Sequence, residues 1–97
     1  MNVKYVLTPR ARNDVDDIDE YTFANWGAAQ AEVYLRRLQQ HIEAVALQPT
    51  AGRACPEYRR GYYKKKCGAH VVFYRIAGDG IEVIRILHES MDFGRHL

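Results

Sequence analysis

The stretch HVVFYRIAGDGIEVIRILH, residues 70–88, has the pattern of two strands joined by a Gly-Asp-Gly turn. Large apolar residues occupy both alternating positions of each segment, and Arg75 and Arg85 stand among them. A hairpin at the surface of a small protein is expected to be apolar on one face only, because the other face meets water. The pattern therefore raises the question of what the second face of this hairpin contacts.

Two registers of the hairpin are compatible with this turn. A two- or four-residue loop places Ile76 opposite Ile81, whereas a three-residue loop, with Gly80 left-handed in a bulge, places Ala77 opposite Ile81. A slip of one residue moves every side chain to the other face of the sheet. We favour the three-residue loop because it separates the side chains better into two faces.

In the favoured register one face packs on helices and the other is an apolar surface that carries two arginines. The helix-facing set is Val72, Tyr74, Ile76, Ile84 and Ile86, and the outward set is Val71, Phe73, Arg75, Val83, Arg85 and Leu87. An exposed apolar patch of this kind usually binds a partner, and arginine offers paired donors to the carboxylates of an amphipathic segment. The alternative is that residues 89–97 fold back over this face through Met91, Phe93 and Leu97.

The remaining segments predict an α+β domain. Residues 3–7 have the pattern of a short strand, Thr8 and Pro9 fit the start of a helix, and Gly27 fits its end. A second helix is predicted over Ala28–Leu47, a loop over residues 49–60, and strands over residues 61–67, 70–76 and 81–88. The order is β-α-α-β-β-β, which predicts a helix hairpin packed on one face of a mainly antiparallel sheet.

Apolar residues recur at helical spacing in both predicted helices. The buried stripe of the first helix is predicted to contain Ala11, Val15, Ile18 and either Tyr21 or Thr22. The stripe of the second helix is predicted to contain Ala31, Tyr34, Leu35, Leu38, Ile42 and Val45.

Length and composition predict one domain that spans residues 1–97. The sequence contains no apolar run long enough to cross a membrane, so a cytoplasmic protein is expected. Cys55 and Cys67 have no zinc-site spacing, and two reduced thiols are expected, although the sequence leaves a bridge between them open. No phosphate loop, paired carboxylates or metal-ligand cluster occurs, which predicts neither a metal nor another cofactor.

The net charge of +2 conceals an asymmetry between the two halves. Residues 1–48 carry five Lys or Arg and seven Asp or Glu, whereas residues 49–97 carry nine and five. The basic half suits an acidic partner, which is either nucleic acid or protein. Lys64–Lys66 follow Tyr62 and Tyr63 in a pattern that can touch phosphates and stack bases, but the small net charge is weak for an autonomous nucleic-acid binder.

Four segments, at residues 7–27, 31–53, 61–75 and 70–92, resemble in order and spacing the ParE branch of the RelE/ParE toxin superfamily. The resemblance covers nearly the whole chain and implies the same β-α-α-β-β-β fold. It also implies the toxin of a bacterial type II toxin–antitoxin pair, with roles in growth regulation and in plasmid or chromosome stabilisation. The implied target is DNA gyrase, a type II topoisomerase. The implied partner is a ParD-like antitoxin, in a hetero-oligomer such as a heterotetramer, and operator DNA is contacted only through the antitoxin.

The RelE branch, which cleaves messenger RNA on the ribosome, is the alternative. In that case His88 is the candidate acid or base, and Arg75 and Arg85 are the candidates for stabilising the phosphorane-like charge. The tail ESMDFGRHL contains no tyrosine of the kind found in RelE-like sequences. We therefore predict a toxin with no catalytic residues, in which His88 is a strand-end histidine.

Two sets of contact residues follow from this interpretation. The predicted antitoxin-binding residues are Phe73, Arg75, Val83, Arg85 and Leu87, together with the exposed flanks of the helices. The predicted target-binding residues are Lys64, Lys65, Lys66, Met91 and Phe93.

Overall fold

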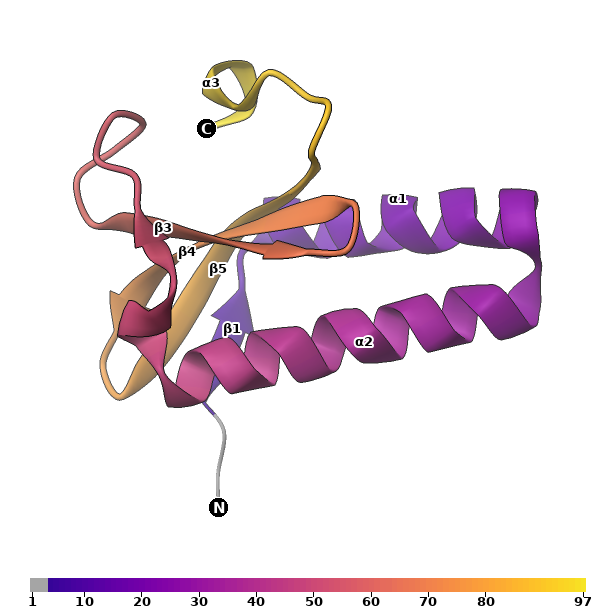
Figure 1. Ribbon diagram of the computed structural model, residues 1–97, viewed down its shortest axis with the longest axis horizontal. Coiled ribbons are helices and arrows are strands. Elements are labelled where there is room, and N and C mark those ends of the chain that lie inside the picture. The colour runs from indigo at the N-terminus through magenta and orange to yellow at the C-terminus, as the bar shows by residue number, and fades with distance from the viewer. Residues whose placement is uncertain (1–3) are drawn as a thin grey trace.

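A computed structural model describes residues 4–97 (Figure 1). Its elements are β1 Tyr5–Leu7, α1 Pro9–Trp26, α2 Ala28–Leu47, the 3₁₀ helix η1 Pro49–Ala51, β2 Arg53–Ala54, β3 Tyr62–Cys67, β4 His70–Ala77, β5 Gly80–His88 and α3 Phe93–His96. The first residue of the strand predicted over residues 3–7 lies outside the described residues, and β1 contains the last three residues of that strand. No helix in residues 4–97 has the length and apolar character needed to cross a membrane.

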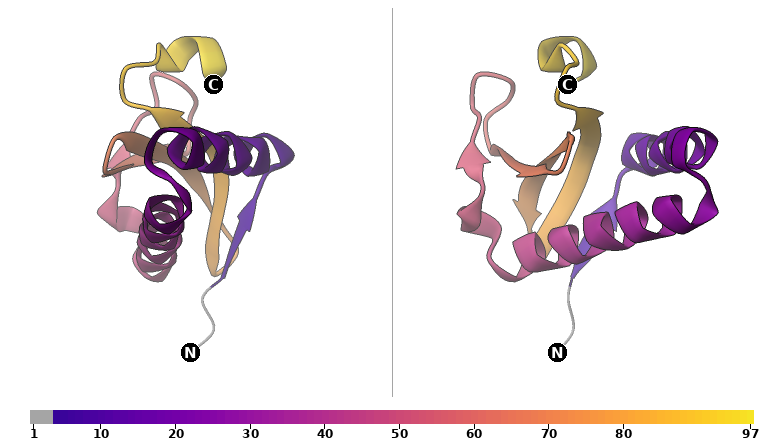
Figure 2. Two further views of the ribbon diagram at one scale, coloured as in Figure 1. Left: turned by 90° about the vertical axis from the view of Figure 1, so that its right-hand side faces the viewer. Right: turned by 45° about the vertical axis from the view of Figure 1, so that its right-hand side comes forward.

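The five strands form one sheet in the order β1-β5-β4-β3-β2. β1 pairs with β5 in parallel, and the other pairs are antiparallel. Figure 2 shows α1 and α2 side by side against the sheet, while α3 lies on the other side of the sheet from α2 in Figure 1. The predicted α+β fold is therefore confirmed, with three additional short elements, η1, β2 and α3.

The ends of the helices follow the predicted sequence signals. The Thr8 hydroxyl accepts a hydrogen bond from the Ala11 N–H at 3.1 Å and donates one to the Ile84 carbonyl at 2.8 Å, which fixes the start of α1 on β5. Gly27, at φ +90°, ends α1 and separates it from α2. Both helices have the predicted bounds, and Thr22 rather than Tyr21 completes the buried stripe of α1.

The core between the helices and the sheet is built from aliphatic side chains and Tyr74. Its buried members are Ala11, Ile18, Leu38, Ile42, Val45, Ala46, Val72, Tyr74, Ile81, Val83 and Ile86. The Tyr74 hydroxyl donates to the Pro49 carbonyl at 2.7 Å and accepts from the Gly52 N–H at 3.1 Å. These bonds anchor the segment after α2, which was predicted as a loop but contains η1 and β2. Elements of two or three residues are too short to show a hydrophobic period.

The turn of the β4–β5 hairpin differs from the favoured register. The loop has two residues, Gly78 and Asp79, and Ile76 pairs with Ile81. Gly78 has a φ of +61°, which a type II′ turn requires at its first central position, whereas Gly80 is not left-handed. The prediction of a three-residue loop is therefore wrong, and the alternative register holds at this end of the hairpin.

A β-bulge restores the favoured register further from the turn. Tyr74 pairs with Val83 but Phe73 pairs with Arg85, so that Ile84 is an extra residue in β5. On the turn side of the bulge, the two-residue loop places Val83 beside Tyr74 in the core on the helix side, where the favoured register had placed it outward. No glycine or proline marks the bulge in the sequence, which is why the pattern of β5 suggested a single register.

The outward face of the hairpin is buried by the chain itself. Val71, Phe73 and Leu87 pack with buried Cys55 and with four partly buried side chains, Tyr58, Tyr62, Phe93 and Leu97. The rings of Phe73 and Phe93 meet at a centroid distance of 5.0 Å. The prediction of an exposed apolar surface is wrong here, and the alternative of coverage by the tail is confirmed for Phe93 and Leu97. Met91 remains 41% exposed.

We expect Gly80→Ala to lower the free energy of unfolding by about 1–3 kcal/mol, the usual cost of forcing volume into a packed site. A Cβ at position 80 would overlap the Lys4 carbonyl oxygen, which accepts the Ile81 N–H at 3.1 Å where β1 meets β5. Urea unfolding followed by circular dichroism measures the change. Gly94→Ala is the control, since its Cβ would meet only Asp92 at 3.5 Å. Equal losses in the two variants would contradict this account of the β1–β5 contact.

Candidate functional site

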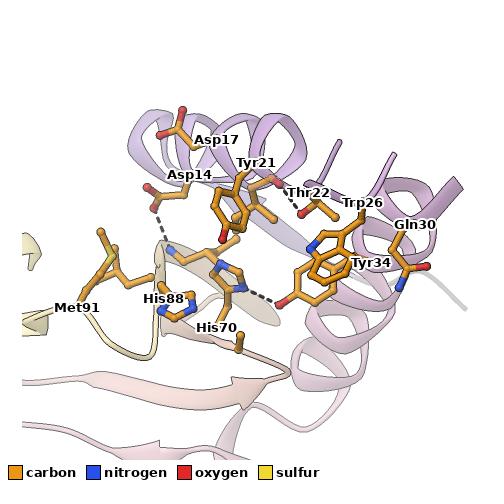
Figure 3. A pocket seen from close by; sticks show the side chains of 14 residues that line it. Asp14, Asp17, Tyr21, Thr22, Trp26, Gln30, Tyr34, His70, His88 and Met91 are labelled. Atoms are coloured by element: carbon orange, nitrogen blue, oxygen red, sulfur yellow. Dashed lines mark hydrogen bonds between the residues drawn. The ribbon is translucent and has the colours of Figure 1, made fainter. Parts of the chain in front are cut away.

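A groove opens between the helix hairpin and the ends of β4 and β5 (Figure 3). Its volume is about 650 Å³. The residues that line it are Asp14, Asp17, Ile18, Tyr21, Thr22 and Trp26 of α1, Gln30 and Tyr34 of α2, and Ala69, His70, Ile86, Leu87, His88 and Met91. We call this feature the helix–sheet groove.

Two large aromatic side chains on α1 border the helix–sheet groove without being buried. Tyr21 is 68% exposed and Trp26 is 70% exposed. Trp and Tyr are enriched among the residues that carry the binding energy of protein interfaces, because they bury much apolar area at little cost in side-chain entropy. The groove therefore has the composition of a protein-binding site.

A cluster of Tyr34, His70 and His88 lines the end of the groove nearest the sheet. The Tyr34 hydroxyl lies 2.5 Å from His70 Nδ1, and His70 pairs across the strands with His88, ring edge to ring face at a centroid distance of 5.4 Å. The Ser90 N–H donates to His88 Nδ1 at 3.1 Å, which assigns the proton of neutral His88 to Nε2. Burial, and then the neighbouring His88, lower the pKa of His70. At neutral pH His70 is therefore an uncharged hydrogen-bonding group.

A buried ion pair forms the boundary between the groove and the opposite face of the sheet. Arg85 donates to both carboxylate oxygens of Asp14, at 2.8 and 2.9 Å, and to the His96 carbonyl at 2.9 Å. Asp14 also accepts the Ile86 N–H at 2.9 Å. The two charged side chains are only 10% and 11% exposed. The hydrogen bonds with Asp14 raise the pKa of Arg85, so the guanidinium stays charged and fully engaged within the chain.

The structure does not bring the predicted antitoxin-binding residues to one exposed surface. Phe73, Val83 and Leu87 are at most 1% exposed, and Arg85 is bound to Asp14. Only Arg75 is accessible, in a surface ion pair with Glu82 at 2.6 Å. As an exposed contact surface the predicted set is wrong. The bulge and the covering tail, neither of which the hairpin pattern shows, are the physical reasons.

The alternative catalytic residues are also dispersed. His88 pairs with His70 and lines the groove on the helix side, whereas Arg85 pairs with Phe73 of the opposite face. Arg75 lies near the turn, two residues along β4 from the position that faces Arg85. These three side chains do not converge on one place where a ribose hydroxyl and its phosphate could sit.

The predicted target-binding residues are divided between two places. Lys64, Lys65, Lys66 and Phe93 border a second cavity of about 380 Å³ on the sheet face away from the helices, with Ala51, Arg53 and Val71. Met91 instead lines the helix–sheet groove. No group of three or more His, Cys, Asp or Glu side chains within residues 4–97 is arranged to hold a metal ion.

Some site residues were missed although the sequence carried a signal for them. Asp14 lies between Ala11 and Ile18 on the buried stripe of α1, where an acid needs a buried partner. Trp26 lies off the stripe, so its side chain had no predicted packing partner. The helical stripe predicts only packing for Tyr34, because its hydrogen bond to His70 depends on tertiary structure.

The fold and the groove define a small α+β protein with a concave face between its helix hairpin and its sheet. The chain belongs to the family described as "ParE toxin of type II toxin-antitoxin system, parDE", which matches residues 5–93. It is 46% identical to Toxin ParE1 of Mycobacterium tuberculosis over 98 residues, which cover all of both chains. It is 45% identical to Toxin ParE1 of Caulobacter vibrioides over 93 residues, 96% of each chain.

A solved structure with the same fold is titled "Chromosomal ParDE TA system from P. aeruginosa". The TM-score is 0.76 over 89% of this chain and 95% of that chain, at 17% sequence identity. At this identity the similarity shows the fold alone. The RelE/ParE-type fold implied by the sequence resemblance is thereby confirmed.

We expect Asp14→Ala to lower the free energy of unfolding by about 3–5 kcal/mol, because it leaves the Arg85 guanidinium buried without its partner. Glu82→Ala is the matched control. It breaks the Arg75–Glu82 pair of the same hairpin, but Arg75 is half exposed, so a loss of at most about 1 kcal/mol is expected. Urea unfolding of both variants measures the difference. Similar losses would show that the Asp14–Arg85 pair is no more important than a surface pair.

Proposed function

We propose that this chain is a non-enzymatic toxin that inhibits DNA gyrase by protein–protein binding and that a ParD-like antitoxin neutralises it by occupying the helix–sheet groove. Membership of the ParE toxin family supports the toxin role and an antitoxin of ParD type. The gyrase target comes from the family resemblance. The proposal requires the cytoplasm as the compartment, since that is where gyrase acts.

The observation that carries the antitoxin part is the pair of exposed aromatic side chains beside the groove. Tyr21 and Trp26 leave most of their apolar surface in water, and a groove of about 650 Å³ runs beside them between two helices and the sheet. An amphipathic helix can place its apolar face in such a groove. Asp17 lines the same groove and favours a basic residue on the antitoxin helix.

The dispersion of His88, Arg75 and Arg85 supports inhibition by binding over RNA cleavage. Cleavage needs a base, an acid and a cationic group around one phosphate. Here His88 is held by Ser90, Arg85 is held by Asp14, and the two lie on different faces of the sheet. Lys64, Lys65, Lys66, Met91 and Phe93 remain the proposed contacts with the target.

Parallel assays of supercoiling and of translation test the function. We expect purified toxin to block supercoiling by gyrase or to stabilise cleaved DNA, and to leave ribosome-bound messenger RNA intact. Addition of the ParD-like antitoxin should restore supercoiling. Cleavage of messenger RNA on the ribosome that is lost in His88→Ala, without an effect on gyrase, would overturn the proposal and favour the RelE-type alternative.

Trp26→Ala tests the groove as the antitoxin site. Loss of a Trp at the centre of an interface typically costs about 2 kcal/mol, or about a 30-fold rise in Kd. Phe23→Ala is the matched control, because Phe23 is 59% exposed on the same helix but does not line the groove. Titration calorimetry with the antitoxin measures both Kd values. Equal weakening in the two variants, or none in Trp26→Ala, would place the antitoxin elsewhere.

A further inference from the structure

The sheet face away from the helices carries a row of cations. Arg53 of β2 is the direct cross-strand partner of Lys64 of β3, and Lys66 follows Lys64 by two residues on the same face. Lys64 pairs in turn with Phe73 and Lys66 with Val71, both of which belong to the buried cluster of that face. The strand geometry therefore holds Arg53, Lys64 and Lys66 together; we call these three residues the basic row.

The charges of the basic row are poorly compensated within the chain. Like charges directly opposite each other on neighbouring strands destabilise a sheet. In residues 4–97 the one ion pair of the basic row joins Lys66 to Glu89 at 3.3 Å, and the two side chains are 66% and 46% exposed. Such exposed pairs contribute little free energy. The basic row thus keeps most of its attraction for an external anion.

The basic row borders an apolar depression rather than a flat surface. The cavity of about 380 Å³ has Val71 and Phe93 among its lining residues, together with the three cations of the basic row and Lys65. Phe93 packs on Phe73 but stays partly exposed. Tyr62, two residues before Lys64 in β3, adds a second partly exposed aromatic side chain to the same face.

We propose that the basic row binds the phosphodiester backbone of a nucleic acid, with Phe93 available to stack on a base. Rows of Lys and Arg beside aromatic rings are the usual means of holding nucleic-acid strands without sequence preference. An acidic peptide would also satisfy the cations, but its carboxylates do not supply an aromatic base to stack on the exposed part of the Phe93 ring. The combination of cations and an accessible ring therefore favours nucleic acid over an acidic protein segment.

This binding goes beyond inhibition of gyrase by protein contact, because it assigns Lys64, Lys66 and Phe93 to the DNA that the target holds rather than to the gyrase protein. A type II topoisomerase holds DNA while it acts, so a toxin bound to it has phosphates within reach of a basic surface. The inference does not need gyrase, however, because the basic row is accessible in the isolated chain. The two proposals can fail separately, because nucleic-acid binding is measured on the toxin and a probe alone, whereas gyrase inhibition is measured by supercoiling.

Fluorescence anisotropy of labelled 20-nucleotide probes tests the inference on the full chain. The probes are single-stranded DNA, duplex DNA and single-stranded RNA, each titrated between 50 and 200 mM salt, and their comparison identifies the source of the phosphates. Three phosphate contacts predict a slope of log K against log salt of about −2 for a single strand and about −2.7 for a duplex. Absence of binding to all three probes at 50 mM salt would overturn the inference.

Two double variants with the same loss of charge provide the decisive comparison. Lys64→Gln with Lys66→Gln should weaken binding at least 10-fold and reduce the single-strand slope to about −0.7, the value for one remaining contact. Arg36→Gln with Arg37→Gln removes two exposed cations from α2, on the other side of the sheet, and should leave the slope unchanged. Circular dichroism checks that both variants fold.

Two further outcomes would overturn the inference. Equal weakening by the two double variants would show that binding follows net charge and not the basic row. Tighter binding of a labelled poly-glutamate peptide than of any nucleic-acid probe would show that the surface serves an acidic protein segment.

Discussion

The buried ion pair between Asp14 and Arg85 joins three parts of the molecule through one set of charged hydrogen bonds. Asp14 belongs to α1, Arg85 to β5, and the same guanidinium donates to the carbonyl of His96 in the tail. Two charges with about a tenth of their surface exposed are tolerable because Arg85 donates three hydrogen bonds and both carboxylate oxygens of Asp14 accept in one geometry. The pair therefore specifies where α1 lies along β5 and where the tail returns.

Both functional surfaces depend on this geometry. On one side, Asp14 lines the helix–sheet groove, so the position of α1 against the ends of β4 and β5 sets the width of the groove. On the other side, the bond to His96 holds the segment that carries Phe93 over Phe73. Phe93 in turn forms part of the cavity beside the basic row. A single arginine thus links the two faces of the sheet.

The fold was predictable because its long elements are locally consistent. The Thr8 cap, the stop at Gly27 and the stripes of both helices gave the observed bounds of α1 and α2. The functional face was not predictable, because it depends on one inserted residue. Ile84 shifts the pairing of β5 beyond Val83, so that each of the two candidate registers holds at one end of the hairpin. Such a bulge arises from tertiary packing and leaves no mark in an alternating pattern.

Tertiary pairing also explains two features of the face away from the helices. The apolar side chains of the β4–β5 hairpin are covered there, and only part of the lysine run of β3 belongs to that face. Phe73 and Leu87 can be apolar because the tail and the loop before β3 cover them. The sequence of the hairpin contains no information about these covering segments. Lys64, Lys65 and Lys66 are consecutive, so the sequence alone does not show which of them share a face of the sheet. Pairing with β2 and β4 selects two of the three lysines for one face and adds Arg53 from eleven residues earlier. In a small sheet protein, cross-strand register therefore decides which charges act together, and the composition of a single strand does not.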